Sequence, residues 1–184
     1  GAYVNNSTDR RGGHGARGEI RITYTSAFST YCSPTFNSGV RPITNVTFEE
    51  INNTTSGAIN TPPALESFCD AATVQPGSSY PISLKGNTNG NNRYWYRVYI
   101  DWDQNGTFGN NPNEIYNIGS LINSNGNNAS TPLNGTIAVP AGASLGITRM
   151  RVMMRYNAYS TGPCQTGNEY GQAEDYSVNV VNPT

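Results

Sequence analysis

The fold class is decided by residues 94–102, which read Tyr94-Trp95-Tyr96-Arg97-Val98-Tyr99-Ile100-Asp101-Trp102. Successive side chains of a β-strand point to opposite faces, so this stretch divides into two sets. The set expected to be buried is Tyr94, Tyr96, Val98, Ile100 and Trp102, and the opposite set is Trp95, Arg97, Tyr99 and Asp101. The alternation predicts a strand with one face in a hydrophobic core.

A second stretch, residues 148–156, alternates in the same way. Its expected core set is Met150, Val152, Met154 and Tyr156, and the other set is Arg149, Arg151, Met153 and Arg155. Three arginines cannot all be buried without partners, so we expect them to face water or carboxylates.

Further short runs of this kind are separated by loops rich in Asn, Gly and Ser, at spacings typical of β-sandwiches. The expected strands are 43–51, 79–84, 93–102, 135–139, 148–156 and 174–181. Strong helix formers are scarce, whereas the chain has 12 Tyr. We therefore predict an all-β domain, an antiparallel β-sandwich of jelly-roll or immunoglobulin-like type.

Charge and length limit the classes of partner. The 184 residues carry 11 basic and 12 acidic side chains, a formal charge of −1, so we expect no nucleic-acid partner. No apolar run approaches the roughly 20 residues of a membrane-spanning helix. The three cysteines lack C-x-x-C spacing, which disfavours zinc and leaves room for one disulfide and one thiol. These features fit an oxidising, extracellular setting.

Residues 1–30 differ in composition from the rest. The chain starts at Gly1 without a Met or an apolar signal core, so we expect a segment of a longer precursor with covalently linked neighbouring domains. Residues 10–18 are basic and glycine-rich, and residues 19–25 alternate with a period of two. We interpret 1–30 as a linker or extra strand, or as the end of a preceding domain, and 31–184 as the β-sandwich domain.

The strongest chemical signal is the loop Asp101-Trp102-Asp103-Gln104-Asn105-Gly106-Thr107-Phe108, followed by Glu114. Oxygen side chains at alternate positions and a Gly that permits a sharp turn favour calcium, and hard oxygen ligands disfavour zinc or copper. The expected ligands are Asp101, Asp103, Asn105, Thr107, Glu114 and Asp175. The alternative is a turn whose Asp side chains cap backbone amides without any metal.

The second candidate site consists of Trp95, Arg97 and Tyr99 on the face opposite the core. Flat rings beside a guanidinium can stack on sugars or hold a peptide. The alternative is that a second layer of chain covers these side chains.

The sequence gives little support to catalysis. The single histidine, His14, lies in the glycine-rich segment, which disfavours a nucleophile–histidine pair. The paired aspartates of the loop are better explained as calcium ligands than as glycosidase acids. We expect no enzyme.

Residues 31–181 resemble the GEVED domain of secreted and surface proteins of Bacteroidetes and related bacteria. The matching stretches are Tyr31-Cys32, Ile43-Thr44-Asn45-Val46-Thr47-Phe48 with Ile51-Asn52-Asn53, Tyr99 to Phe108 with Glu114, Ile137-Ala138-Val139-Pro140, Thr148-Arg149-Met150-Arg151-Val152, Pro163-Cys164, and Gly171-Gln172-Ala173-Glu174-Asp175-Tyr176-Ser177-Val178. The last stretch carries the motif that names the family, with Gln172 and Ala173 where Glu and Val are usual.

The resemblance implies a non-catalytic β-sandwich attached to peptidases, glycosidases or adhesins. It also implies a disulfide between Cys32 and Cys164 and leaves Cys69 outside the family pattern. Positions 107 and 109, acidic in many relatives, are Thr107 and Gly109 here, which should weaken calcium affinity.

Our leading hypothesis is a calcium-stabilised, secreted or cell-surface accessory module of a larger bacterial protein that binds a glycan or a surface polymer. The alternatives are a structural spacer or adhesin segment without a ligand, or a protein-binding module attached to a secreted peptidase. A spacer predicts that Trp95 and Tyr99 are covered.

Overall fold

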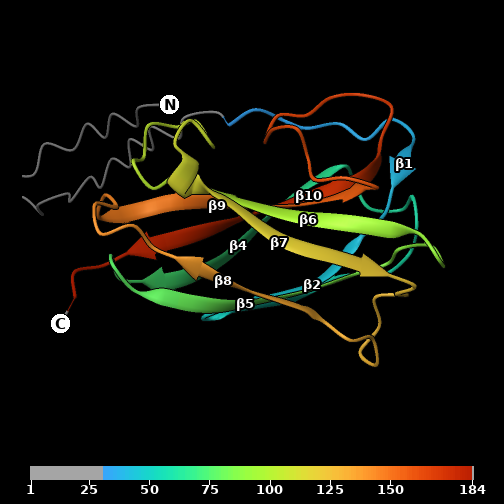
Figure 1. Cartoon of the computed structure of the whole chain (residues 1–184), viewed down its shortest axis with the longest axis horizontal. Helices are drawn as coiled ribbons and strands as arrows, with labels where there is room; N and C mark the ends of the chain where they lie inside the picture. The colour runs from blue at the N-terminus through green and yellow to red at the C-terminus, as the bar shows by residue number, and fades with distance from the viewer. Residues whose placement is uncertain (1–30, 184) are drawn as a thin grey trace, which may run out of the picture.

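The computed structural model describes residues 31–183, and these form a sandwich of two β-sheets (Figure 1). The expectations for residues 1–30 lie outside the described residues. The elements in chain order are β1 (Gly39–Val40), β2 (Ile43–Phe48), β3 (Ile51–Thr54), β4 (Leu65–Val74), β5 (Ser79–Gly86), β6 (Arg93–Ile100), the 3₁₀ turn η1 (Pro112–Glu114), β7 (Ile115–Ile122), β8 (Leu133–Ala138), β9 (Gly146–Tyr156) and β10 (Tyr170–Val180).

The larger sheet has the strand order β1-β10-β9-β6-β7, and β4 also pairs with β10. The smaller sheet has the order β3-β2-β5-β8. All pairs are antiparallel except β1 with β10 and β4 with β10, which are parallel. The predicted all-β sandwich is confirmed, and the two parallel pairs are an addition to the antiparallel arrangement expected from the sequence.

The structure refines several predicted strands. The run predicted over 43–51 contains β2 and only the first residue of β3, because the chain turns at Glu49, whose φ is 48°. Strand β6 ends at Ile100, so Asp101 and Trp102 belong to the following loop. Strands β4 and β7 lie where no strand was predicted.

The main core lies between the two sheets and contains the predicted face of β6. Tyr94, Tyr96, Val98, Ile100 and Trp102 are all at most 3% exposed. They pack with apolar side chains of the smaller sheet, among them Phe48, Ile82, Leu84 and Ile137. None of the helical segments in residues 31–183 is long and apolar enough to cross a membrane.

A second, smaller core lies on the outer face of the larger sheet. It contains Phe36, Tyr99, Phe108, Met153 and Ala173. The segment that begins at Tyr31 and the loop between β9 and β10 run together over this face, joined by backbone hydrogen bonds such as Thr35 N–H to the Gln165 carbonyl (2.9 Å) (Figure 1). The disulfide between Cys32 and Cys164 links the same two segments, as the family resemblance implied.

Arg151 anchors this layer from the centre of the larger sheet. Its Nε and Nη2 donate to the two carboxylate oxygens of Asp175 at 2.7 and 2.8 Å, and both side chains are almost fully buried. Its Nη1 donates to the carbonyls of Cys32 (2.7 Å) and Pro163 (2.9 Å), one on each covering segment. The guanidinium thus joins β9, β10 and both segments beside the disulfide.

The other two arginines of β9 also meet carboxylates. Arg149 lies 3.7 Å from Asp175, and Arg155 lies 2.6 Å from Glu169. The expectation that this row faces carboxylates or water is confirmed.

Replacing Asp175 by Asn should lower the free energy of unfolding by roughly 3–5 kcal/mol, because a buried guanidinium would lose its charge partner. Urea denaturation measures the loss, and Asp70→Asn, on the exposed part of β4, serves as the control with a change within about 0.5 kcal/mol. A loss below about 1 kcal/mol in Asp175→Asn would contradict the role assigned to the pair.

Candidate functional site

The acidic loop leaves the larger sheet where β6 ends and returns to it through η1 and β7. Backbone conformations with positive φ at Gln104 (57°), Gly106 (83°) and Gly109 (70°) bend it back on itself. One carboxylate oxygen from each of Asp101, Asp103 and Glu114 lies within 4.8 Å of the other two. Three of the six predicted metal ligands are therefore brought together.

Asp101 is fully buried at the base of this loop. Its Oδ1 accepts from the backbone N–H of Asn105 (3.2 Å), and its Oδ2 accepts from the N–H of Gly106 (2.8 Å) and the hydroxyl of Tyr31 (2.6 Å). The Thr148 hydroxyl donates to its backbone carbonyl. These bonds fix the direction in which the loop leaves β6.

Asp103 and Asn105 form the exposed tip of the loop. The Asp103 Oδ1 accepts from the Asn105 N–H (3.2 Å), and its Oδ2 accepts from the Asn105 side-chain amide (2.9 Å). The Asn105 Oδ1 in turn accepts from the Thr107 N–H (2.8 Å). This is the amide-capping pattern of the metal-free alternative, and it leaves further lone pairs on each oxygen.

Glu114 closes the loop from its far end. Its Oε1 accepts from the N–H of Trp102 (3.1 Å), and its Oε2 accepts from the N–H of Gly109 (2.9 Å). The Glu114 side chain is buried, although it belongs to a turn at the surface, and these two bonds satisfy its carboxylate. The side chain of Asn111 caps the N-terminus of η1 and Pro112 occupies its first turn, which places Glu114 at the third position.

Two of these carboxyl groups have perturbed acidity. Burial raises the pKa of Asp101, and the hydrogen bonds from Tyr31 and Gly106 partly oppose this. Burial raises the pKa of Glu114, and the charges of Asp103 and Asp101 add to the effect. The cluster therefore gathers negative charge in a partly desolvated place, which a bound cation would relieve.

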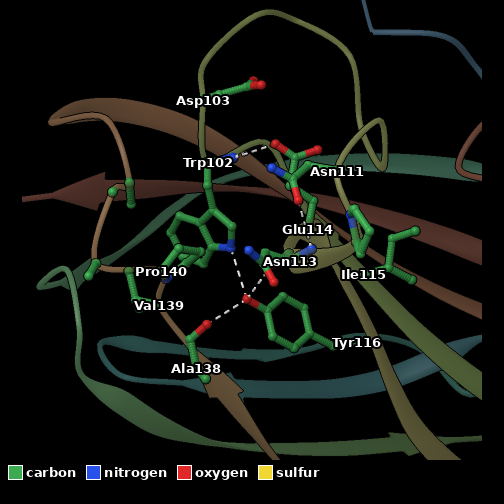
Figure 2. A pocket seen from close by; sticks show the side chains of 14 residues that line it. Trp102, Asp103, Asn111, Asn113, Glu114, Ile115, Tyr116, Ala138, Val139 and Pro140 are labelled. Carbon is green, nitrogen blue, oxygen red and sulfur yellow. Dashed lines mark hydrogen bonds between the residues drawn. The ribbon is translucent and has the colours of Figure 1, made fainter.

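A pocket of about 620 Å³ adjoins the acidic cluster, and Asp103 and Glu114 belong to its wall (Figure 2). At its centre the Tyr116 hydroxyl accepts from the Trp102 indole N–H (2.9 Å) and contacts the carbonyls of Asn113 (2.9 Å) and Ala138 (2.6 Å). Burial raises the pKa of Tyr116, so its phenol stays neutral. The acidic loop thus forms one side of this pocket, and the turn after β8 forms the other.

The structure does not bring Asp175 to the acidic cluster. Both of its oxygens are occupied by Arg151, so the expectation that it is a metal ligand is corrected to a role in a buried ion pair. Glu174, its neighbour, points to the opposite face as β-strand geometry requires. The Thr107 side chain is exposed, and only its backbone N–H contributes to the loop.

The second candidate site is also corrected. Tyr99 is 1% exposed and its hydroxyl shares a hydrogen bond with Ser160 (2.9 Å), so it is unavailable to a ligand. Trp95 is half-buried with its ring 4.8 Å from that of Tyr159, and Arg97 donates to the Ser160 carbonyl (2.6 Å). The β9–β10 loop covers these side chains, which is the alternative that the sequence analysis left open.

Sequence reasoning did not place Tyr31, Thr148 or Tyr116 at the site. Tyr31 and Thr148 are far from the loop in the chain and reach it only through the sheet and the covering segment. Tyr31 precedes Cys32 in a stretch that resembles the family. This adjacency is the one feature of the sequence that points to a role for Tyr31.

The family model of the GEVED domain matches residues 95–179. The resemblance seen in the sequence is thereby confirmed over these residues. The match runs from β6 to β10. It includes the acidic loop, Arg151, Cys164 and the two buried acidic residues Glu174 and Asp175. Within the GEVED motif, the Asp175 side chain pairs with Arg151 on the outer face of the larger sheet. The Glu174 side chain points to the opposite face, into the main core.

Solved structures with a similar backbone are remote. A family 123 glycoside hydrolase from Clostridium perfringens has 15% identity and a TM-score of 0.37, over 67% of this chain and 24% of that one. A cellulose-active lytic polysaccharide monooxygenase in complex with copper has 14% identity and a TM-score of 0.32, over 60% of this chain and 53% of that one.

A third structure, an AA10 lytic polysaccharide monooxygenase from Streptomyces lividans, has 14% identity and a TM-score of 0.28, over 59% of each chain. This chain spans less than two thirds of each of the three proteins, and TM-scores this low carry no information about function. No curated protein matches the sequence.

Glu174 is the buried acid of the GEVED motif. It is 1% exposed, its Oε2 accepts from the Tyr176 hydroxyl (2.7 Å), and its Oε1 has no hydrogen-bond partner among the described residues. Burial raises its pKa to about 8, the Tyr176 bond opposes this, and the nearby Glu66 charge adds to it. The carboxyl group is therefore mostly neutral at pH 7.

The pKa of Glu174 is about 8 in the folded state, above its ordinary value of 4.5. The neutral carboxyl group is compatible with burial below pH 4.5, where it costs no stability. As the pH rises from 4.5 through 8, the unfolded state ionises more readily than the folded state, so the free energy of unfolding falls. Glu174→Gln should therefore gain stability over the native protein between pH 5 and 9, by at most roughly 5 kcal/mol. Thermal melts across this range, with the exposed Glu49→Gln as control, measure the difference. A difference that is independent of pH would contradict the raised pKa.

Proposed function

We propose that this chain is a calcium-stabilised, non-catalytic binding module of a larger secreted or cell-surface protein, and that its ligand is carbohydrate. The observation that carries the first part is the convergence of Asp101, Asp103 and Glu114 on one place. Carbohydrate as the ligand class is supported by exposed tyrosine rings, which lie away from the site expected at Trp95, Arg97 and Tyr99.

The donor set fits calcium. Calcium–oxygen distances of about 2.4 Å place two opposed ligands nearly 5 Å apart, which matches carboxylate oxygens within 4.8 Å of one another. Asp101, Asp103 and Glu114 would hold the ion, and the Asn105 side-chain oxygen is the further candidate that the loop offers. Since Glu114 also binds the N–H groups of Trp102 and Gly109, the ion would tie both ends of the loop together.

Added calcium should raise the melting temperature, and a chelator should reverse the rise, because a ligand that binds only the native state stabilises it by mass action. At a calcium concentration 100 times the dissociation constant the gain is about 2.7 kcal/mol. Differential scanning calorimetry measures it. Identical melting curves in calcium and in chelator would remove the metal from the proposal.

The matched variant Asp103→Asn separates a calcium site from a metal-free capped turn. Asn keeps an acceptor for the Asn105 N–H, but it removes one charge from the cluster and the acceptor of the Asn105 side-chain amide. In chelator the variant should be about as stable as the native protein, because the reduced carboxylate repulsion offsets the loss of this exposed hydrogen bond. In calcium it should be the less stable of the two, and equal stability there would favour the metal-free turn.

Carbohydrate is favoured by exposed aromatic side chains in a molecule with few charges. Tyr156 is 38% exposed and Tyr170 is 36% exposed, and they neighbour one another at the ends of β9 and β10. Tyrosine rings offer a flat face for the C–H groups of a sugar and a hydroxyl for its oxygens.

A structural spacer is the second candidate function. The burial of Tyr99 and the cover over Trp95 are the observations that favour it, because a spacer does not need these side chains at the surface. A spacer binds no saccharide, whereas the module proposed here does.

A non-catalytic module should not turn over generic peptidase or glycosidase substrates. The carboxylates of the acidic loop are engaged by the loop's own N–H groups, as expected for groups that shape a turn. Purified protein should therefore give rates equal to buffer in fluorogenic assays. Turnover that is present in the native protein and absent in Asp103→Asn would overturn the assignment.

A further inference from the structure

A pocket of about 250 Å³ lies at the opposite end of β6 from the acidic loop, where β6 begins and β9 ends. It is lined by Arg41, Asn89, Asn92, Tyr94, Tyr156 and Tyr170. These residues come from four parts of the chain: the segment after β1, the β5–β6 loop with β6, the end of β9, and the start of β10. Its volume is below the roughly 300–1,000 Å³ of sites for drug-sized ligands, which suits a single sugar residue.

Arg41 is held rigidly in the wall of this pocket. Its guanidinium stacks on the Tyr170 ring, 4.5 Å from the centroid. Its Nη1 donates to the side-chain oxygen of Asn60 (2.9 Å) and to the carbonyl of Val40 (3.1 Å). An arginine fixed on both sides in this way loses little conformational freedom when a ligand binds.

Gly39 makes this arrangement possible. A Cβ at this position would lie 2.5 Å from the Asn60 side-chain oxygen and 3.3 Å from both the Arg41 Nη1 and the Tyr170 ring. The backbone φ of 136° is also one that other residues rarely adopt. The absence of a side chain lets the partners of Arg41 approach it.

The charge of Arg41 has no counterpart in the described part of the chain. The side chain is only 8% exposed, it forms no ion pair with any of residues 31–183, and its Nε has no hydrogen-bond partner there. Arg151, the other deeply buried arginine, is neutralised by both oxygens of Asp175. A buried charge without a partner lowers the stability of the fold. The guanidinium of Arg41 therefore gives this pocket a positive charge that an anion would neutralise.

The rest of the pocket suits a sugar ring. The Tyr156 ring is 6.3 Å from that of Tyr170 at 88°, and 5.4 Å from that of Tyr94, so the aromatic surfaces form a corner. Asn89 and Asn92 line the pocket from the loop before β6. The Asn92 Nδ2 donates to the Asn89 carbonyl (2.6 Å), and the Asn92 side-chain oxygen and the Asn89 side-chain amide are groups of the kind that pair with hydroxyl groups. Burial raises the pKa of Tyr94 to about 12, against the effect of the Arg41 charge, so its phenol remains neutral.

We propose that this pocket binds a negatively charged sugar residue, whose anionic group pairs with Arg41 while its ring packs in the corner formed by Tyr156 and Tyr170. This inference rests on the proposed carbohydrate-binding function and adds the site and the charge of the ligand. A carboxylate on a uronic acid and a sulfate ester both carry the required charge.

Isothermal titration calorimetry with two matched probes tests the charge, with calcium held constant. Trigalacturonate carries carboxylates, and its methyl ester is the same saccharide without them. The acid should bind at least about ten-fold more tightly, and its advantage should shrink as salt rises. A sulfated oligosaccharide that binds better than its unsulfated form supports the inference and identifies sulfate as an accepted anion.

Variants test the place. Tyr156→Ala and Tyr170→Ala should each weaken binding of the acid about ten-fold or more, and Ile147→Ala, at an exposed position on the other end of β9, should leave it unchanged. Arg41→Met should reduce the affinity for the acid to that for the ester. Melting temperatures verify folding, and if Arg41→Met does not fold, the salt dependence of the native protein decides on the charge.

Four results overturn the inference in distinguishable ways. Equal binding of acid and ester that depends on Tyr156 and Tyr170 leaves the carbohydrate-binding function and removes the anionic ligand. Acid binding that is unaffected by Tyr156→Ala and Tyr170→Ala moves the site elsewhere. Failure of every saccharide to bind removes the proposed ligand class as well, and a triglutamate peptide that binds as tightly as the acid replaces sugar by peptide.

Discussion

The buried ion pair between Arg151 and Asp175 is the interaction on which the outer half of this structure depends. It spans the two central strands, and the remaining nitrogen of the guanidinium holds the carbonyls of Cys32 and Pro163. The disulfide joins the same two covering segments beside it. A charged group at the centre of a sheet thus organises a second hydrophobic layer, which in turn buries Tyr99 and positions Tyr31 against Asp101.

The alternation of side chains predicted the strands that have one face in the core, and it failed for two strands of a different kind. Strand β4 (Leu65–Val74) pairs on one side only, is exposed over much of its length and is rich in small side chains, so no period of two appears. Strand β7 (Ile115–Ile122) carries a bulge at Ile118, which has no partner between the pairs Tyr96 with Gly119 and Arg97 with Asn117. Edge strands and bulged strands are stabilised by their neighbours more than by their own sequence.

The candidate site was predictable where ligand spacing is local and unpredictable where it depends on tertiary contacts. The positions of Asp101, Asp103 and Glu114 follow from the turn that encloses them. The burial of Tyr99 was beyond the reach of periodicity, because the segment that covers it lies some 60 residues away in the chain. The same limit applies to Arg41, which acquires its setting from residues 60 and 170.

The central place of β10 has a consequence for the order in which the chain can fold. The last strand of the described chain is the partner of β1, β4 and β9, so the first half of the larger sheet has no template until residues 170–180 exist. Contacts of such long sequence separation make folding slow. Strands β1 and β4 therefore lack their partner until β10 has been synthesised, whereas β2, β3 and β5 of the smaller sheet can pair before then.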